Sequence, residues 1–421
     1  MRILHVVPRY WPFLGGSERW FQEISERLAA DGHQVTVLTT NAWDLEYFWD
    51  RHKQSIPVTE EAHNGVVIRR LPVRHLPFSG IVFPGTRRVM CWLARGPRLG
   101  RNALFPLGAT TPLVPSLPRE LSRLNPAPEI VHAATVPFDS LVYYAQQYAR
   151  SRGIPFIMSP QTHLGEPESD EVRRHYTLPN QIEMMRRSTF VIVRTDIERD
   201  NLEALGVPRD KMVRVPAGAE PREMTGMGER FRKKHGLHQP IVFSLGALAY
   251  DKGSMTLVEA MKLLWSEGLK AHLVMAGPLM EPFRQYMEAQ PDEVKARCLV
   301  PGFISLEEKA DLLDAGDVFV MASRTDSFGI VYLEAWLNRK PVIGAWAGGV
   351  PDVISQGEDG FLVRFGDAGE LAARIKQLLE NRKLARQMGM RGERKTLENY
   401  TWDRVYEQVL PLYIGTKVGV S

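Results

Sequence analysis

The hydrophobic positions of the chain fall into short apolar runs that alternate with segments of helical periodicity. The first unit has an apolar run at 2–7, a loop ending in Gly15-Gly16, a helix from Ser17 with apolar residues every three or four positions, and a second run at 34–39. Such a succession predicts a β-α-β unit with parallel strands. The same alternation fills residues 129–215 and 241–400, so we predict an α/β protein with two doubly wound parallel sheets facing across a cleft.

The expected boundaries follow from where this alternation stops. Residues 216–238 replace it with Gly, Pro and charge, which is typical of a linker. We therefore predict a Rossmann-like N-terminal domain at 1–216, a linker at 217–238 and a Rossmann-like C-terminal domain at 239–400. Within them we expect several further elements: helices at 140–150, 171–187, 196–205, 254–265 and 305–314, and strands at 66–73, 129–133, 155–159, 190–194, 211–215, 241–245, 272–276, 298–303, 317–322, 341–345 and 360–363.

Composition narrows the class of protein. At 421 residues, with 44% hydrophobic and 24% charged residues, the chain suits two soluble domains. Its two cysteines lack partners at disulfide or metal-ligand spacing, and no segment has the roughly 18 apolar residues of a membrane span. The apolar run in the opening MRILHVVP is too short for a signal peptide, so we expect a cytoplasmic protein. A net charge of +4 does not demand nucleic acid, and no nucleic-acid-binding motif is present, so we expect no nucleic-acid partner.

The least regular region, 74–128, leaves two interpretations open. Its arginines alternate with apolar residues: Arg87, Arg88, Arg95, Arg98 and Arg101 with Val89, Met90, Trp92 and Leu93. Such a basic amphipathic piece fits peripheral contact with an anionic membrane at its inner face. It fits equally a solvated helix that covers the N-terminal sheet. A second cluster, the aromatic residues at 43–49, either stacks on a sugar or lipid-linked acceptor or packs an insertion onto the domain.

Candidate chemistry gathers at the ends of predicted strands. After the run 317–322 comes a strand-to-helix turn with Asp326, and Glu334 follows two helical turns later. The backbone N–H groups of Ser327, Phe328, Gly329 and Ile330 would point outward there, which suits a phosphate or a sugar hydroxyl. A helix-capping aspartate and a solvated glutamate would explain this pair alone. Lys252 and Gly348-Gly349 occupy similar turns of the second half, and His163 and Gly15-Gly16 of the first.

These segments resemble one known family along nearly the whole chain, region 74–128 excepted. S-R-T-D-S-F-G-I-V-Y-L-E-A at 323–335 resembles the E-x7-E signature of retaining glycosyltransferases of family 4 (glycosyl transferases group 1), which have the GT-B fold. The further matches are Gly15-Gly16-Ser17-Glu18 with G-G-x-E, Ile130-Val131-His132 with d-v-v-H, Gly153-Ile154-Pro155 with g-I-P, Lys252-Gly253 with K-G, and Gly348-Gly349-Val350-Pro351-Asp352 with G-G-V-P-E. The order and spacing of these motifs together are specific.

The resemblance implies a function and a role for each matching residue. The implied reaction moves a hexose-type sugar from a UDP or GDP donor to a hydroxyl acceptor, with retention and without metal or any cofactor besides the donor. Lys252 and the Gly16 amide would bind the diphosphate, Glu334 the ribose, Asp326 with the 327–330 backbone the donor sugar, and His163 the sugar side of the reaction centre. A helix at 401–415 would pack back on the first domain. The acceptor would be lipid-linked or part of a cell-surface glycan.

The chain departs from the family pattern at three positions that concern the donor. Ala247 stands where the family usually has an arginine before the lysine, Ala217 where it has an asparagine, and Asp326 where it has a longer glutamate. Arg324 or an arginine of the first domain would have to replace the lost guanidinium. An alternative function is therefore a catalytically weak or silent partner that binds nucleotide sugar. A third, less favoured, is a nucleotide-sugar epimerase.

Overall fold

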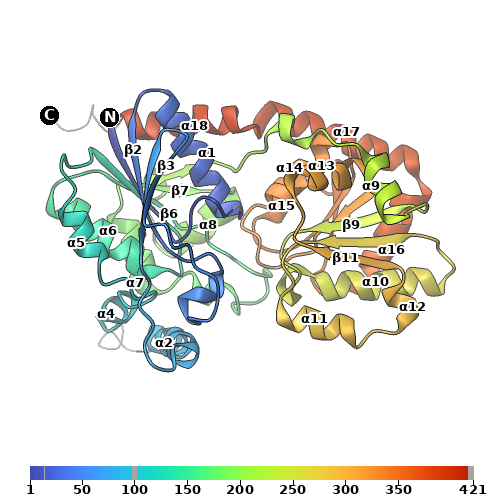
Figure 1. Ribbon diagram of the computed structural model, residues 1–421, viewed down its shortest axis with the longest axis horizontal. Coiled ribbons are helices and arrows are strands. Elements are labelled where there is room, and N and C mark those ends of the chain that lie inside the picture. The colour runs from blue at the N-terminus through green and yellow to red at the C-terminus, as the bar shows by residue number, and fades with distance from the viewer. Residues whose placement is uncertain (14, 97–101, 416–421) are drawn as a thin grey trace. The chain divides into compact units, whose positions relative to one another are not determined.

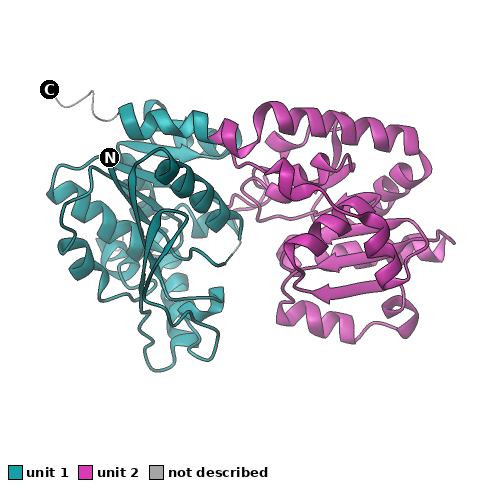
Figure 2. Ribbon diagram, turned by 45° about the horizontal axis from the view of Figure 1, so that its top comes forward, with its two compact units in different colours: residues 1–162, 171–215, 406–421 teal, residues 163–170, 216–405 magenta. Residues whose placement is uncertain are grey.

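The computed structural model describes residues 1–13, 15–96 and 102–415. It divides into two compact units, drawn in two colours in Figure 2. Unit 1 comprises 1–162, 171–215 and the chain from Tyr406, and unit 2 comprises 163–170 and 216–405. Each unit contains one largely parallel sheet with its own buried apolar core. The predicted α/β fold with two parallel sheets is therefore confirmed.

The sheet of unit 1 has the strand order β3-β4-β2-β1-β5-β6-β7-β8. Four of its strands, β2, β3, β6 and β7, are labelled in Figure 1. All neighbours pair in parallel except the edge strand β3, which is antiparallel to β4 and was not predicted. The strands are β1 (Arg2–Val6), β2 (Gln34–Thr40), β3 (Glu60–His63), β4 (Val66–Leu71), β5 (Ile130–Ala134), β6 (Phe156–Ser159), β7 (Phe190–Val193) and β8 (Met212–Arg214). The chain reverses its direction of winding between β1 and β5, so their carboxyl ends form the place where such sheets bind ligands.

The helices of unit 1 follow the predicted alternation with two exceptions, 171–187 and the region around α2. They are α1 (Gly16–Ala30), α2 (Ser79–Ala94), α4 (Leu104–Gly108), α5 (Leu117–Ser122), α6 (Asp139–Ser151), α7 (Pro179–Arg187) and α8 (Asp196–Ala204), with 3-10 turns at Leu45–Phe48, Arg173–His175 and Arg209–Lys211. The prediction of one helix over 171–187 is wrong. A proline disfavours the helical conformation of the residue before it, so α7 starts only at Pro179.

The sheet of unit 2 has six parallel strands in the order β11-β10-β9-β12-β13-β14. Numbered from β9, this is the order 3-2-1-4-5-6 of doubly wound nucleotide-binding sheets. The strands are β9 (Ile241–Leu245), β10 (His272–Ala276), β11 (Cys298–Gly302), β12 (Val318–Val320), β13 (Val342–Ala345) and β14 (Gly360–Val363). The central strands are apolar and fully buried because helices cover both faces. The winding direction reverses between β9 and β12.

The helices of unit 2 carry the turns that contain the candidate residues. They are α9 (Gly228–His235), α10 (Ser254–Ser266), α11 (Glu281–Glu288), α12 (Asp292–Lys295), α13 (Leu306–Ala315), α14 (Ile330–Leu337), α15 (Val350–Val353), α16 (Ala368–Glu380) and α17 (Arg382–Asn399), with 3-10 turns at Pro221–Met224 and Tyr250–Lys252. The final helix, α18 (Trp402–Ile414), starts in unit 2 and ends in unit 1.

The segment 217–238, predicted as a linker, is an ordered part of unit 2. Its helix α9 packs against α13, and Arg230 Nε lies 2.5 Å from Asp311 Oδ2. Arg232 reaches Asp317 at 2.9 Å. The charges that suggested a linker are thus cationic partners for carboxylates of the same unit. Charge-rich composition resembled solvent exposure because the acidic partners lie about 80 positions further along the chain.

Region 74–128 contains helix α2, which begins eight residues before the predicted basic segment and includes Pro84. Arg87, predicted as part of an outward basic face, is buried. Its Nη1 lies 3.3 Å from Asp139 Oδ2 and its Nη2 donates to the His175 carbonyl at 2.6 Å. The expectation is therefore wrong for Arg87, because a buried aspartate provides its charge partner. Arg98 and Arg101 lie outside the described residues.

The end of α18 is held in unit 1 by a buried hydroxyl. The Tyr413 Oη atom lies 3.0 Å from His5 Nε2 and 2.6 Å from His132 Nδ1. Burial lowers the pKa of His5 to about 3 and the pKa of His132 well below its ordinary value, so both neighbours of the hydroxyl can serve as neutral imidazoles. His132, matched above to the d-v-v-H strand, therefore has a structural role here.

Among the described residues, no helix combines the length and apolar character that crossing a membrane requires.

Candidate functional site

The turns that follow β9 and β12 carry the best-defined candidate site. The two strands are neighbours in the sheet of unit 2, and the direction of winding reverses between them. In open α/β sheets, ligands bind at the carboxyl ends of the strands beside such a reversal. Lys252 follows β9 and Asp326 follows β12. The topology therefore places both residues at the expected binding edge.

Lys252 and Asp326 form an ion pair. The Lys252 Nζ atom lies 2.9 Å from Asp326 Oδ2, and both side chains are largely shielded from solvent. The turn is fixed by Gly253, which has a φ of +74° and would place a β-carbon 2.3 Å from the Ala322 carbonyl oxygen. No side chain fits there, so the backbone after Lys252 can lie directly against the end of β12. The motif K-G thus aims the ammonium group at the Asp326 turn.

Asp326 is held in its ionised form by these neighbours. Burial raises the pKa of its carboxyl group, but the charge of Lys252 and hydrogen bonds from Ser323 and Lys252 outweigh burial and leave the pKa below its ordinary value. The site therefore contains one fixed carboxylate beside one cation. A bound diphosphate would add negative charge there, so the position of Lys252 decides whether the carboxylate and the phosphate groups can share the site.

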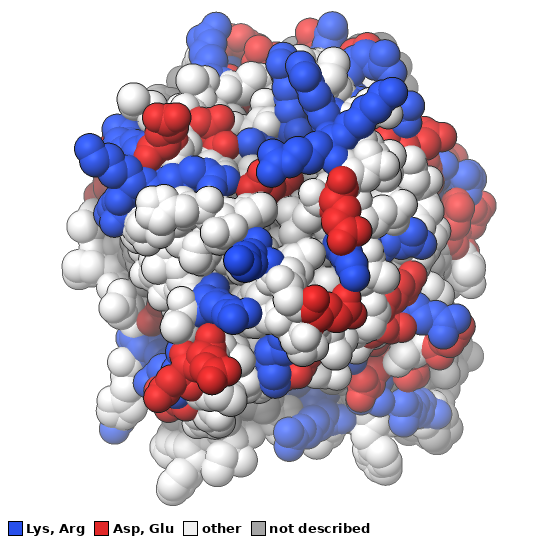
Figure 3. Space-filling model, turned by 90° about the vertical axis from the view of Figure 1, so that its right-hand side faces the viewer, with Lys and Arg blue, Asp and Glu red and all other residues white. Residues whose placement is uncertain are grey.

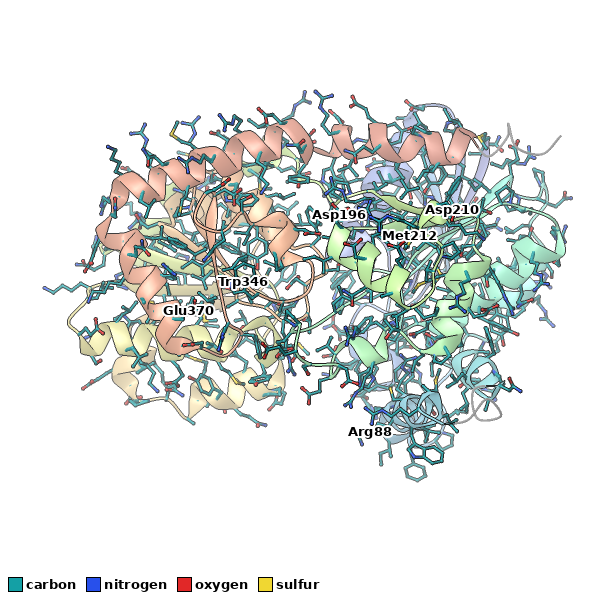
Figure 4. The ribbon with its side chains drawn as sticks, turned by 180° about the vertical axis from the view of Figure 1, so that it is seen from behind. Arg88, Asp196, Asp210, Met212, Trp346 and Glu370 are labelled. Carbon is teal, nitrogen blue, oxygen red and sulfur yellow. The ribbon has the colours of Figure 1, made fainter. Side chains whose placement is uncertain are left out.

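The Gly348-Gly349 turn closes on the same carboxylate loop. The Gly349 N–H donates to the Asp326 carbonyl at 3.0 Å, and the Gly348 N–H donates to the Gly165 carbonyl at 2.8 Å. Gly348 has a φ of +59°, and a β-carbon on it would lie 2.1 Å from the Asp326 carbonyl oxygen. The two glycines thus connect the Asp326 turn with the loop that contains His163. Trp346, labelled in Figure 4, follows β13 at this edge and is 43% exposed.

His163 belongs to unit 2, although the sequence placed it within the N-terminal domain 1–216. Residues 163–170 leave the first sheet and are held by the Gly348 turn and by Arg324, whose Nη1 lies 3.5 Å from Glu166 Oε1. Burial and the charge of Lys252 lower the pKa of His163 to about 4, against the opposing effect of Asp326. The imidazole is therefore neutral near pH 7 and able both to donate and to accept a hydrogen bond.

Glu334 lies on the second turn of α14 and is buried, with 8% of its surface exposed. Its Oε1 atom lies 2.6 Å from Lys309 Nζ, whereas its Oε2 atom is buried without a hydrogen-bond partner among the described residues. A buried carboxylate oxygen without a donor is costly unless a ligand provides one. Glu334 therefore offers a buried hydrogen-bond acceptor and is not part of a solvated helix face.

The backbone between Asp326 and Glu334 offers further donors. Helix α14 begins at Ile330, and its N-cap Gly329 has no side chain to bind the first amides. Among the described residues, the backbone N–H groups of Ser327, Phe328, Gly329 and Ile330 have no hydrogen-bond acceptor. These amides can therefore bind an anion or a hydroxyl. Phe328 contributes only its backbone because its ring is buried against Tyr400, at a centroid distance of 5.5 Å.

The corresponding turn of unit 1 contains Gly15 and Gly16 at the start of α1. The carboxylate of Glu18 is buried in the first helical turn and lies 2.9 Å from both Nε and Nη2 of Arg9. The Arg9 guanidinium in turn lies 3.8 Å from the centre of the Phe13 ring. The N-terminus of α1 thus has one ordered ion pair beside its glycines. The sequence pointed to the glycines but not to Arg9.

The sequences of both units match models of known protein families. Residues 15–218 match the model of the glycosyl transferase 4-like domain, and residues 228–395 match that of the glycosyl transferases group 1. Together the two models span both units. The chain belongs to the group 1 glycosyltransferases of family 4. The resemblance recognised in its motifs is confirmed.

Individual relatives agree with this assignment. Sulfoquinovosyl transferase SQD2 of Arabidopsis thaliana is 25% identical over 417 residues, which cover 95% of this chain and 70% of that protein. Among solved structures, HepE of Anabaena in complex with UDP aligns with a TM-score of 0.71 at 17% identity, over 99% of this chain and all of that one. Sucrose-phosphate synthase of Thermosynechococcus elongatus aligns with a TM-score of 0.75 at 19% identity over both whole chains. These structures have the GT-B fold, which confirms the predicted fold class.

In this glycosyltransferase, Arg324 cannot replace the arginine lost at Ala247 without competition. Its Nε atom donates to Asp251 Oδ1 at 2.8 Å, and its guanidinium carbon lies 5.3 Å from the centre of the Tyr250 ring and 5.2 Å from that of Phe365. Asp251 and Glu166 already partly neutralise this cation, so a phosphate would have to compete with two carboxylates. A role of Arg324 in donor binding stays a prediction.

Sequence reasoning missed two partners of the candidate residues. Lys309 is the cation that orients Glu334, and Glu166 fixes the His163 loop through Arg324. Lys309 lies on the predicted helix 305–314, four positions after its N-cap, where a lysine is usually solvated. Its carboxylate partner Glu334 lies on α14, 25 positions further along the chain. No signal in the sequence marked either contact.

We expect the imidazole of His163 to stay neutral well below its ordinary pKa. In ¹H–¹³C NMR spectra, the signal that disappears in His163→Asn should keep its position from pH 8 to pH 5 and shift only near pH 4. In the urea-unfolded chain the same signal should titrate near pH 6.5. Since the unfolded state then binds a proton that the folded state does not, this group makes the protein less stable as pH falls from about 6.5 to about 4. A midpoint near 6.5 in the folded protein would contradict the burial of His163.

Proposed function

We propose that this protein transfers a hexose-type sugar from a nucleoside diphosphate donor, UDP or GDP, to a hydroxyl acceptor, with retention of configuration and without a metal ion. The observation that carries the proposal is the joint placement of a cation, a fixed carboxylate and a neutral imidazole at the strand reversal of unit 2. The partner-free oxygen of Glu334 adds an acceptor for a ribose hydroxyl at the end of the same turn.

The proposed chemistry uses these groups where charge develops. The bond between the sugar C1 and the β-phosphate oxygen breaks, while the acceptor oxygen forms a bond to C1 on the same face. The acceptor proton passes to the departing phosphate. Lys252 and the free amides at 327–330 would stabilise the negative charge on that phosphate. A fixed ammonium group and a helix N-terminus would provide this charge without a metal.

Asp326 and His163 would act on the sugar side. A carboxylate beside C1 favours the oxocarbenium-like charge of the transition state, and a neutral imidazole can bind a sugar hydroxyl without adding a competing cation. Lys252, which is paired with Asp326, would also contact the diphosphate, so one ammonium group would serve both. The shorter aspartate in place of glutamate would move the carboxylate away from the sugar by about one methylene.

Two complexes of one structural neighbour support UDP as the first donor to test. HepE of Anabaena is solved with UDP and with UDP-glucose, and both complexes align with this chain at TM-scores above 0.7. A GDP donor remains the second choice. The protein would act in the cytoplasm, in the synthesis of a cell-surface glycan or glycolipid. The exposed apolar side chains of α2, among them Ile81 and Trp92, favour a lipid-linked acceptor.

A second candidate function is a silent partner that binds nucleotide sugar without turnover. The observation that favours it is the combination of Ala247 with an Arg324 already bound to two carboxylates, which leaves one fewer cation for the diphosphate. Without that charge the leaving group would be stabilised less. The two functions share a binding site and differ only in turnover.

A donor screen distinguishes these functions. UDP-, GDP- and ADP-sugars would be offered without acceptor, and nucleoside diphosphate and free sugar would be measured first without and then with EDTA. We expect slow release from one donor and, by NMR of the fresh product, the anomer of the donor. Tight nucleotide binding with no release from any donor would favour the silent partner. Release that stops on adding EDTA would reject the metal-free mechanism.

A further inference from the structure

Helix α2 carries an apolar stripe that the rest of the described chain leaves uncovered. Five large apolar side chains on it and at its N-cap are exposed: Phe78 by 81%, Ile81 by 75%, Val82 by 40%, Val89 by 47% and Trp92 by 73%. They stand 3, 4, 11 and 14 positions after the first, so they share one helical face. Single exposed apolar residues are ordinary, whereas a contiguous stripe marks an interaction surface.

The opposite face of α2 fixes this orientation. Arg87 is buried against Asp139, Met90 is fully buried, and Cys91 Sγ lies 3.2 Å from His175 Nδ1. These contacts tie α2 to α6 and to the turn at Arg173–His175 of the same unit. The helix therefore cannot rotate its apolar stripe inward without breaking a buried ion pair.

The N-cap of the helix is an independent observation. Phe78 has a φ of +58°, an uncommon conformation for a bulky residue, and its ring is nonetheless the most exposed large apolar side chain of the described chain. Packing within the molecule does not offset this backbone strain. Strained residues persist where the surrounding structure or a function requires them.

Charge around the stripe indicates the kind of partner. Residues 79–95, helix α2 and its C-cap, contain three arginines and no aspartate or glutamate. Arg88 on α2, labelled in Figure 4, and Arg95 at its C-cap are exposed beside the apolar stripe. Aromatic and aliphatic side chains bordered by arginine are the composition of helices that lie in the interface of an anionic bilayer. The exposed guanidinium groups of Arg88 and Arg95 are complementary to the anionic headgroups of such a bilayer.

We propose that the α2 stripe docks unit 1 onto an anionic membrane, with Phe78, Ile81 and Trp92 entering the boundary between headgroups and acyl chains. The arginines beside the stripe contact the lipid phosphates. This docking proposal depends only on the exposed residues of α2 and not on the proposed glycosyl transfer. The lipid-linked acceptor that it favours also rests on the proposed glycosyl transfer.

A second basic surface, on unit 2, provides the matched comparison. In Figure 3, Lys and Arg side chains gather along the upper part of the face, at the level of α17 in Figure 1. Helix α17 contains six basic residues but exposes only Met390 and Leu397 among large apolar ones, at 47% and 45%. Charge alone would bring α17 to a membrane only in low salt, whereas the α2 stripe adds insertion of apolar side chains.

Cosedimentation of the full chain with vesicles tests the proposal. Vesicles of phosphatidylcholine with 30% phosphatidylglycerol would be compared with pure phosphatidylcholine, in low salt and in 0.5 M NaCl. We expect Ile81→Ser/Trp92→Ser to lower the partition coefficient at least tenfold on the anionic vesicles. The α17 controls, Lys383→Gln/Arg394→Gln for charge and Met390→Ser/Leu397→Ser for apolar surface, should change it less than twofold.

Four results would overturn the docking proposal. They are wild-type protein that stays in the supernatant, an α2 variant that sediments like the wild type, a loss of binding in the α17 controls equal to that in α2, and a change of oligomeric state in the α2 variant, since a second copy would then cover the stripe. Thermal melting and release of free sugar from a soluble donor should be unchanged in Ile81→Ser/Trp92→Ser. A wild type that binds vesicles but turns over no donor would reject the proposed transferase function and leave docking intact.

Discussion

Lys252→Ala should lower the turnover of the donor by about 10²- to 10³-fold. A donor aimed at charge that develops in the transition state is typically worth this much. The loss has two causes in this site. The departing phosphate loses its ammonium group, and Asp326, 2.9 Å from Lys252 Nζ in the intact protein, becomes an uncompensated carboxylate facing the diphosphate. Steady-state release of nucleoside diphosphate measures the effect.

Two controls separate the role of this lysine from general charge loss. Lys262→Ala removes a cation from α10 that is paired with Glu259 at 3.0 Å, far along the helix from the Lys252 turn, and should leave turnover within twofold. Asp326→Asn in the Lys252→Ala background should recover binding of the nucleotide, since the repelling carboxylate is gone, but not turnover. If Lys252→Ala turns over donor at the wild-type rate, the ammonium group does not stabilise the leaving group and the proposed mechanism fails.

The sequence predicted most of this architecture because each β-α unit buries its own apolar pattern. Strand β9 and helix α10 were correct within one residue, and the turns after β9, β12 and β13 followed from them. Their convergence follows from the rule that parallel strands present their carboxyl ends at one edge. The rule predicts that Lys252 and Asp326 lie at the same edge of the sheet, although it does not predict the ion pair between them.

What the sequence did not predict depends on contacts between distant segments. Lys309 looked like a solvated helix residue until a carboxylate of α14 paired with it, and Arg87 looked like part of a basic face until Asp139 paired with it. Residues 163–170 likewise belong to unit 2 because the Gly348 N–H and Arg324 hold them there. Both partners lie more than 150 positions further along the chain, so the sequence around His163 does not predict these contacts. Local periodicity determines the elements, whereas buried charge pairs are decided by tertiary packing.

Glu334→Ala should weaken the binding of UDP or GDP by about 10- to 100-fold. The partner-free Oε2 atom can accept a hydrogen bond from a ribose hydroxyl, and a hydrogen bond to a buried carboxylate is worth about 1.5–3 kcal/mol. The substitution also leaves Lys309 without its carboxylate, which would lower the stability of unit 2. Glu334→Gln keeps an acceptor of the same shape and therefore tests the charge separately. Isothermal titration calorimetry measures the affinity, and thermal melting reports on the fold.

A comparison of UDP with 2′-deoxy-UDP and 3′-deoxy-UDP assigns the effect to the ribose. If Glu334 binds a ribose hydroxyl, the wild type should prefer UDP to one deoxy analogue by about 10-fold, and Glu334→Ala should bind both with the same affinity, because the lost hydrogen bond is then absent in either ligand. A general loss of folding would instead weaken all three nucleotides equally and preserve the preference. Lys309→Met keeps Glu334 but removes its orienting cation, so it should reduce the preference without abolishing it. Equal affinity for UDP in the wild type and Glu334→Ala would refute the ribose assignment. The buried carboxylate would then have only a structural role, as the ion-pair partner of Lys309.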